Sequence, residues 1–230
     1  MDWSPVWISL QISILATLIT GVLGIFCAWR VYRSERRGRR ILDVLLTIPL
    51  VLPPTVTGFL LLMLFGKHGF FGNPLQQIGI RIVFTKTAAV LAAVTVSFPL
   101  MYRSAKAAFE QVDIRLVQAA QTLGMPEFSI FRKIILPLAL PGVISGGILS
   151  FARALGEFGA TLMVAGNIPG VTQTLPQAIY MQIQGGRTEE ATGWVLLLVT
   201  ISFIMILGIN GIALRKMRWE RKDHELTGKS

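Results

Sequence analysis

Five long apolar runs, separated by charged or glycine-rich connections, constrain the fold of this chain more than any other feature. They lie at about residues 7–29, 44–65, 85–102, 134–154 and 194–214. A helix needs roughly 20 apolar residues to cross about 30 Å of hydrocarbon, so each run has about the length of a membrane-spanning helix. Of the 230 residues, 53% are hydrophobic and only 15% are charged, which is typical of an integral membrane protein.

The runs are expected to be helices, because backbone groups in lipid need partners within their own segment and no ten-residue alternating pattern indicates a barrel. We therefore predict an all-α integral membrane protein that forms a single transmembrane domain over residues 1–230, with about five spans. Too little sequence remains for a soluble enzyme domain. The one cysteine, Cys27, lies inside the first run, and His68 and His224 have no metal-binding neighbours in the sequence, so we expect no metal site and no catalytic residues.

Basic residues predict how the chain is oriented in the membrane. The connection between the first two runs, "RVYRSERRGRR", holds six arginines and one glutamate, and the tail after the last run holds six basic and three acidic residues. By the positive-inside rule both segments face the cytoplasm, and five spans then place the N-terminus outside. Topology and anionic headgroups explain the net charge of +10, because no stacking platform or groove-reading motif points to nucleic acid.

The connection at 103–133 is long for a turn and lies in the cytoplasm under this topology. Apolar residues recur in it at helical spacing, at Ile114, Val117, Ala120 and Leu123. Gly124 can adopt the left-handed conformation that ends a helix, and Pro126 suits the first turn of the next one. The sequence therefore predicts two short helices that meet at an angle.

Seven residues in and after this connection have a fixed spacing: Gln118, Ala119, Ala120, Gly124, Ile134, Leu136 and Pro137. The pattern resembles the EAA motif of bacterial ABC importer permeases, in which Glu-Ala-Ala, three residues, glycine and nine residues precede Ile-x-Leu-Pro. Gln118 stands where the motif has glutamate. The resemblance implies that the loop docks into a cleft on a cytoplasmic ATPase subunit. The alternative is an amphipathic hairpin that lies on the membrane or packs against the chain's own helix ends.

Prolines and glycines interrupt two of the apolar runs, 44–65 and 134–154. A proline inside a helix removes a backbone hydrogen bond at a cost of about 3 kcal/mol or more, which predicts spans that bend or line a cavity. Close packing through small residues is the alternative. The candidates for the pore or gate are Pro53, Pro54, Thr55, Thr57, Ser145, Ser150, Arg153 and Glu157.

Two accounts remain open for Arg153 and Glu157, which are four residues apart and share one helix face at the outer end of their run. Either the two residues form a structural ion pair, or Arg153 provides a positively charged, transient binding site for an oxyanion near an external gate. The glycine-rich segment that follows is too short to cross the membrane, so we expect an external half-helix and loop there.

Two further stretches, "SFARALGEFGATLMVAGNIPG" and "DVLLTIPLVLPPTVTGFLLL", together with the EAA-like loop, resemble the permease subunits of molybdate ABC importers, with sulfate permeases as near relatives. The resemblance implies a MetI-like fold in the bacterial inner membrane and a homodimer of permeases. It also implies an external molybdate-binding protein and two cytoplasmic ATPase subunits, which would use ATP and Mg²⁺. The chain itself would be no enzyme and would bind no cofactor.

The sequence leaves the transported solute open. Tungstate and sulfate are tetrahedral dianions like molybdate, thiosulfate is carried by related permeases, and no dense cage of donors distinguishes them here. An ion-coupled carrier or a channel is the alternative from another class, although the chain shows no internal repeat and neither class explains the spaced motif.

Overall fold

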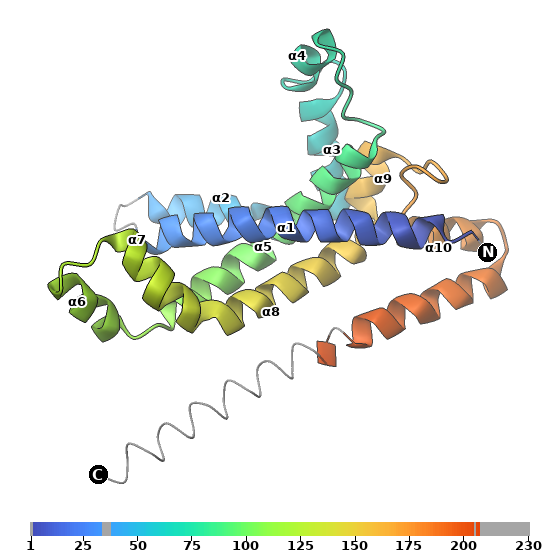
Figure 1. Cartoon of the computed structure of the whole chain (residues 1–230). Helices are drawn as coiled ribbons and strands as arrows, with labels where there is room; N and C mark the ends of the chain where they lie inside the picture. Colours follow the sequence, from blue (N-terminus) through green and yellow to red (C-terminus); the bar gives the residue numbers. More distant parts are fainter. Residues whose placement is uncertain (1, 34–37, 205, 208–230) are drawn as a thin grey trace.

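Helices make up most of the computed structural model, which describes residues 2–33, 38–204 and 206–207 (Figure 1). The described residues contain no strand, and the predicted all-α fold is confirmed. The helices in chain order are α1 (Ser4–Arg33), α2 (Arg39–Val51), α3 (Pro54–Phe65), α4 (Gly72–Gln77), α5 (Lys86–Glu110), α6 (Ile114–Thr122), α7 (Glu127–Ile130), the π-helical turn η1 (Phe131–Ile135), α8 (Leu136–Leu155), α9 (Gly159–Ala165) and α10 (Leu175–Gln184). A further helix covers 188–204 and 206–207.

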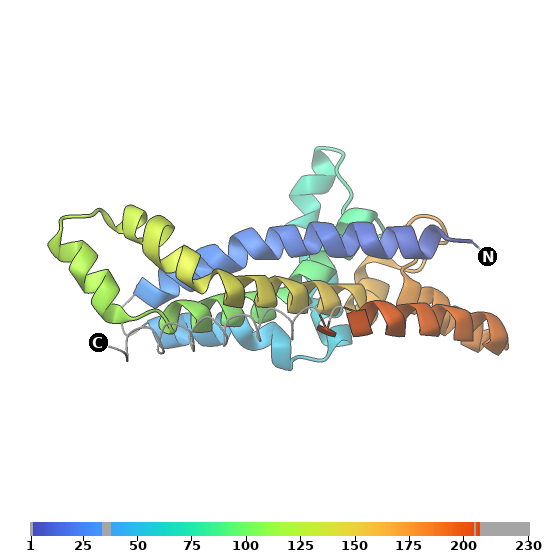
Figure 2. The same cartoon turned by 60° about the horizontal axis from the view of Figure 1, so that its bottom comes forward.

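The long helices α1, α5 and α8 lie side by side in both views and form the centre of the molecule (Figures 1 and 2). Small residues let their backbones approach closely. A Cβ added at Gly24 of α1 would lie 2.8 Å from Met101 Cγ, and one added at Gly146 of α8 would lie 2.6 Å from Ser104 Cβ. Such packing through small residues holds membrane helices together, because lipid provides no hydrophobic drive between them.

The second apolar run differs from the expected single span at 44–65. It forms two helices, α2 and α3, whose axes differ by 112°. Leu52 caps α2 with an extended backbone, ψ 138°. The next two residues, Pro53 and Pro54, carry no N–H group and cannot continue the helical hydrogen bonds. The prolines therefore turn the chain, and α3 projects away from the bundle (Figure 1).

In the part of the chain that the structure describes, three continuous helices are long and apolar enough to cross a membrane: α1, α5 and the stretch Glu127–Leu155, which joins α7, η1 and α8. The bent pair of α2 and α3 provides a fourth crossing if it counts as one span. The expected runs 7–29, 85–102 and 134–154 lie within the three continuous helices. The last described helix covers the first part of the run at 194–214, while the rest of that run and the basic tail lie outside the described residues.

Two shorter helices cover the end of the bundle near the N-terminus (Figure 1). The expected half-helix after α8 is α9, seven residues long. The loop that follows leads to α10, where Gln177 Oε1 accepts a hydrogen bond from the N–H of the N-cap residue Thr174 at 2.9 Å. The Leu175 N–H donates to Ser9 Oγ of α1 at 2.7 Å, which fastens this cover to the bundle.

Candidate coupling loop and translocation path

The connection between α5 and α8 forms an elbow of two helices at one end of the bundle (Figure 2). Asp113 begins α6 by accepting a hydrogen bond from the Arg115 N–H at 2.8 Å. Gly124 has φ +73°, the left-handed conformation that its position after α6 required. Pro126 is the N-cap of α7, one residue before the first turn. The elbow expected from the sequence is therefore present.

The two alanines of the motif face opposite environments. Ala119 and Gln118 are exposed, whereas Ala120 is only 4% exposed and packs in the same hydrophobic cluster as Val117. Ala120 thus holds α6 against α7 and η1, whereas the Ala119 side chain is exposed.

The end of the motif lies where the elbow joins α8. Ile134 and Leu136 are partly buried against the core of the bundle, and Pro137 is exposed. Pro137 is the second residue of α8, and because α8 continues from η1 its missing N–H leaves the Lys133 carbonyl without that helical donor. The second half of the motif therefore fixes the elbow to a membrane helix.

The pore candidates fall into two groups. Thr57 and Ser150 are buried, and their hydroxyls donate to the carbonyls of Pro53 at 3.4 Å and Ser97 at 3.3 Å. Ser145 is half-buried, and its hydroxyl donates to the Pro141 carbonyl at 2.9 Å. The residues at the bend, Pro53, Pro54 and Thr55, are exposed. Among the pore candidates, these three residues at the bend are the most exposed in one copy of the chain.

Arg153 and Glu157 are joined as their spacing predicted, with Arg153 Nη1 2.6 Å from Glu157 Oε2. The other carboxylate oxygen of Glu157 accepts a hydrogen bond from the Ala160 N–H at 2.7 Å, at the start of α9. The Glu157 side chain is 2% exposed and that of Arg153 is 30% exposed. Glu157 therefore connects the end of α8 to α9, and the Arg153 side chain remains partly exposed.

Several candidates meet where α3 begins. A Cβ added at Gly159 would lie 3.2 Å from Pro54 Cβ and 3.3 Å from Thr55 Cγ2, so the bend packs against the start of α9. The bend and the Arg153–Glu157 pair thus approach the same short helix from two sides. Ser145 and Ser150 belong to the middle of α8.

Sequence reasoning did not find the polar cluster around Asp43 of α2. The Tyr102 hydroxyl donates to Asp43 Oδ1 at 2.5 Å, and Lys106 Nζ lies 2.8 Å from Asp43 Oδ2. Nearby, Arg39 Nη2 lies 2.9 Å from Glu110 Oε1. These contacts tie α2 to the C-terminal half of α5. They border a cavity of about 290 Å³ lined by Asp43, Val44, Thr47, Arg103, Lys106, Ala107 and Glu110.

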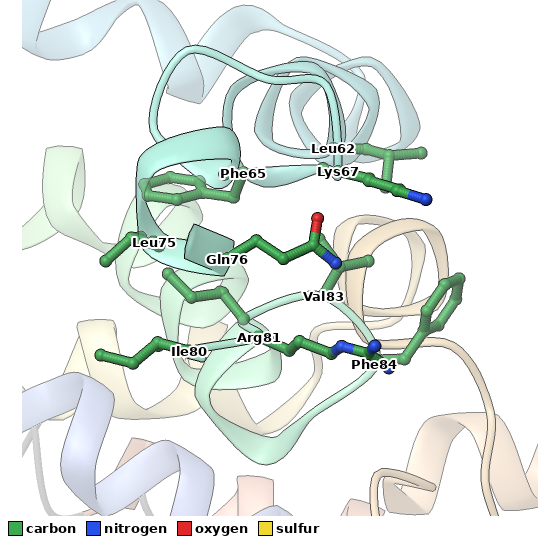
Figure 3. Close-up of a pocket in the computed structure, with 12 residues that line it drawn as sticks. Leu62, Phe65, Lys67, Leu75, Gln76, Ile80, Arg81, Val83 and Phe84 are labelled. Carbon is green, nitrogen blue, oxygen red and sulfur yellow. The ribbon is translucent and has the colours of Figure 1, made fainter. Parts of the chain in front are cut away.

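A larger cavity, of about 390 Å³, lies between the end of α3, α4 and the segment before α5 (Figure 3). Its walls are mostly apolar, and Gln76, Lys67 and Arg81 supply the polar groups. Figure 3 shows the Gln76 side chain between those of Lys67 and Arg81. Nothing in the spacing of these residues along the chain indicated that they would converge. Among the described residues, no three His, Cys, Asp or Glu side chains lie close enough to hold a metal ion.

Solved structures support the fold. The methionine ABC transporter MetNI, in an inward-facing conformation, matches with a TM-score of 0.68 and 16% identity over 90% of this chain and 94% of that chain. A bacterial alginate ABC transporter in complex with an alginate-bound periplasmic protein matches with a TM-score of 0.75 and 18% identity, over 92% and 78% of the two chains. The expected MetI-like importer fold is confirmed.

Curated relatives match over nearly the whole length. The "Molybdenum transport system permease protein ModB" of Escherichia coli (strain K12) is 47% identical, over 89% of this chain and 90% of its own length. The "Putative molybdenum transport system permease protein YvgM" of Bacillus subtilis (strain 168) is 46% identical, over 90% and 92%. The "Sulfate transport system permease protein CysT" of Salmonella typhimurium is 32% identical, over 94% and 82%.

A family model described as "Binding-protein-dependent transport system inner membrane component" matches residues 21–217. This match, together with the relatives above, confirms the resemblance found in the sequence. The relatives are permease proteins, which agrees with the expectation of a transport component and not an enzyme. The chain belongs to the family of binding-protein-dependent transport system inner membrane components.

Proposed function

We propose that this chain is the membrane-spanning permease subunit of an ATP-driven importer that carries molybdate into the cytoplasm. It acts as a homodimer with two cytoplasmic ATPase subunits and an external molybdate-binding protein. The partner ATPases bind and hydrolyse ATP with Mg²⁺, and the chain itself binds no cofactor. The proposal rests on the 47% identity to a molybdenum transport permease and on the exposed surface of the elbow.

The elbow carries the apolar surface that an ATPase subunit would cover. Leu123 is 81% exposed, Phe128 63%, Ile114 55% and Leu116 48%. Under the proposed topology these side chains face cytoplasmic water, where lipid cannot cover them. Exposed apolar patches of this kind mark protein interaction sites. Ala119 lies on the same exposed part of α6, so its small side chain allows a partner surface to come close.

The proposed orientation has the N-terminus outside and the C-terminus in the cytoplasm. The elbow lies at the end of the bundle opposite the N-terminus (Figure 1). The same end carries the basic residues Arg30, Arg33, Arg39, Arg40, Arg103, Lys106, Arg115, Arg132 and Lys133. At the N-terminal end, the rings of Trp3 and Trp194 meet edge-on with centroids 5.3 Å apart, as expected of aromatic residues at the headgroup level.

The bend between α2 and α3 supports a translocation path along its own exposed surface. Because Pro53 and Pro54 have no N–H, the carbonyls of Pro49 and Leu50 lose the donors that a continuous helix would provide. Irregular backbone at membrane depth is tolerated only where protein buries it or where it lines water. The bend is exposed in one copy, so a second copy facing it would enclose an aqueous path lined by Pro53, Pro54 and Thr55.

In this scheme the elbow works as a lever. Closure of the ATPase pair on ATP moves the two elbows, and the paired bundles change from inward-facing to outward-facing. The anion released by the binding protein enters the path, and hydrolysis resets the assembly. Gln118, in the place of the glutamate of the motif, removes one charge from the docking surface and leaves its shape unchanged.

We propose molybdate as the solute, before tungstate, sulfate and thiosulfate, because two molybdenum permeases are 46% and 47% identical to this chain and the sulfate permease is 32% identical to it. The described part of the path shows no cage of donors that would discriminate between tetrahedral dianions. We therefore assign most of the selectivity to the external binding protein.

Reconstitution tests the proposal. The chain is co-purified with its ATPase and placed in vesicles with the binding protein and labelled molybdate, with excess sulfate or tungstate as competitors. The expected result is molybdate uptake that needs ATP and resists sulfate. Equal uptake without the ATPase would instead support an ion-coupled carrier or a channel. Preferential competition by sulfate would reassign the solute.

A further inference from the structure

An aromatic cluster joins the elbow to the inner end of α1. The Trp29 ring of α1 stacks on Phe131 of η1, with centroids 4.7 Å apart and planes inclined by 30°. Phe109 of α5 meets Phe131 edge-on at 5.6 Å, and Phe128 of α7 lies 6.5 Å from Trp29. Phe131 is 9% exposed and Phe109 is fully buried, so their contact is part of the packed interior at that end. Rings of two other helices, α1 and α5, therefore converge on Phe131.

Charged groups reinforce the same junction. Arg33, in the last turn of α1, forms an ion pair with Glu127, the first residue of α7. The Arg33 guanidinium also lies over the Trp29 ring, 5.3 Å from its centroid. Because Trp29 and Arg33 both belong to α1, the arginine extends from a ring of its own helix to the second arm of the elbow, and the ion pair with Glu127 is its contact between the two segments.

The π-helical turn directs Phe131 into this junction. Helix α7 continues through η1 into α8 without a break, so the second arm of the elbow and the membrane helix form one rod. A π-helical turn has one residue more than an α-helical turn and is frequent at functional sites. The buried residues of the rod recur four apart, at Phe131, Ile135, Ala139 and Val143, so this face stays against the bundle.

We propose that the Trp29–Phe131 stack and the Arg33–Glu127 ion pair lock the inner end of α1 to the second arm of the elbow. Motion imposed on the elbow by the ATPase then moves α1 and α8 together as one rigid unit. Trp29, Arg33, Glu127 and Phe131 are positioning residues for transport and do not touch the anion. This inference rests on the proposed function, because it assigns a path for the force that the elbow receives.

The first test measures anions transported per ATP hydrolysed in the reconstituted complex with labelled molybdate. Trp29→Ala and Phe131→Ala are expected to lower this ratio about three- to tenfold, while ATP hydrolysis continues. The double variant is expected to fall no further than either single variant. Trp29→Phe keeps a ring for stacking and is expected to restore most of the ratio, which simple loss of folded protein would not explain.

Trp7→Ala is the matched control, because Trp7 lies near the other end of α1 and is 65% exposed. Its ratio is expected to stay at the wild-type value. An unchanged ratio in Trp29→Ala, or losses that add in the double variant, would overturn the proposal. If the wild-type complex itself shows no ATP-dependent molybdate uptake, the proposed function fails instead, so the two failures are distinguishable.

The second test fixes the junction covalently. In a Cys27→Ala background, Arg33→Cys and Glu127→Cys are joined by a short bis-maleimide, and the joined and unjoined forms of the same protein are compared. If α1 and the elbow move as one unit, uptake by the joined form equals or exceeds that of the unjoined form, which lacks the Arg33–Glu127 ion pair. Arrest of uptake by the link would mean that the two segments separate during the cycle, and the proposal would be wrong.

Discussion

Tyr102 of α5 donates a 2.5 Å hydrogen bond to Asp43 of α2, although 59 positions separate the two residues in the sequence. Lys106 holds the other oxygen of the same carboxylate at 2.8 Å. The prolines turn the chain away immediately after α2, so this helix has only a short length over which to pack on the bundle. The polar contacts at Asp43 compensate for that shortness by fixing α2 to α5.

Asp43→Ala is therefore expected to loosen α2 and lower the thermal midpoint of the purified protein in detergent. The expected cost is about 1–3 kcal/mol, because Tyr102 and Lys106 both lose a partner in a partly buried place. Glu110→Ala is the control, since its contact with Arg39 is more exposed and is expected to cost about 1 kcal/mol or less. Equal losses of stability in the two variants would show that the Asp43 cluster stabilises the protein no more than the exposed Arg39–Glu110 pair does.

The left-handed turn at Gly124 allows a sharper test of the elbow. A side chain there would meet nothing within 4 Å, so only the backbone conformation limits the choice of residue. Gly124→Val is expected to cost about 1–2 kcal/mol and to displace the elbow, which would reduce ATP-dependent uptake. Gly124→Asn tolerates φ above zero and is expected to keep most of the uptake.

Gly147→Ala controls for the loss of a glycine as such, because this helical position also has open space around it. Uptake by that variant is expected to match the wild type. If Gly124→Val and Gly124→Asn lost uptake equally, the turn conformation would not be what the elbow needs.

Local features of the fold could be predicted from the sequence, because local chemistry determines them. Gly124 and the prolines act within a few residues of their own position, so the elbow and the interruption near Pro53 follow from spacing alone. The apolar runs predict helices for the same reason.

Features that depend on tertiary packing could not be predicted in this way. Ala119 and Ala120 are the same type of residue, and only the packing of α6 on α7 and η1 decides that Ala120 is buried. Thr57 and Ser150 look like pore residues by composition, yet α9 and α5 cover them. The partners of Asp43 lie on another helix, and periodicity along one segment carries no information about them.

The packing of α3 on α9 predicts a strong effect at Gly58. A Cβ at this position would lie 2.7 Å from Ala160 Cα and 2.8 Å from Ala160 O, which are backbone atoms that cannot easily move aside. Gly58→Ala is therefore expected to lower the thermal midpoint, by about 1–3 kcal/mol of stability. Gly21→Ala has nothing within 4 Å and is expected to be neutral or slightly stabilising. A neutral result at Gly58 would mean that the close approach of α3 and α9 is absent in solution.

The Arg153–Glu157 pair can be tested for the two roles left open by the sequence. Because Glu157 is nearly fully buried and also binds the Ala160 N–H, removal of the Arg153 charge leaves a buried carboxylate with one fewer partner. Arg153→Gln is expected to cost about 1–3 kcal/mol. The double variant with Glu157→Gln removes both charges and is expected to recover part of that stability and most of the molybdate uptake. A double variant that is as stable as the wild type but inserted and inactive would instead assign Arg153 a direct role in conducting the anion.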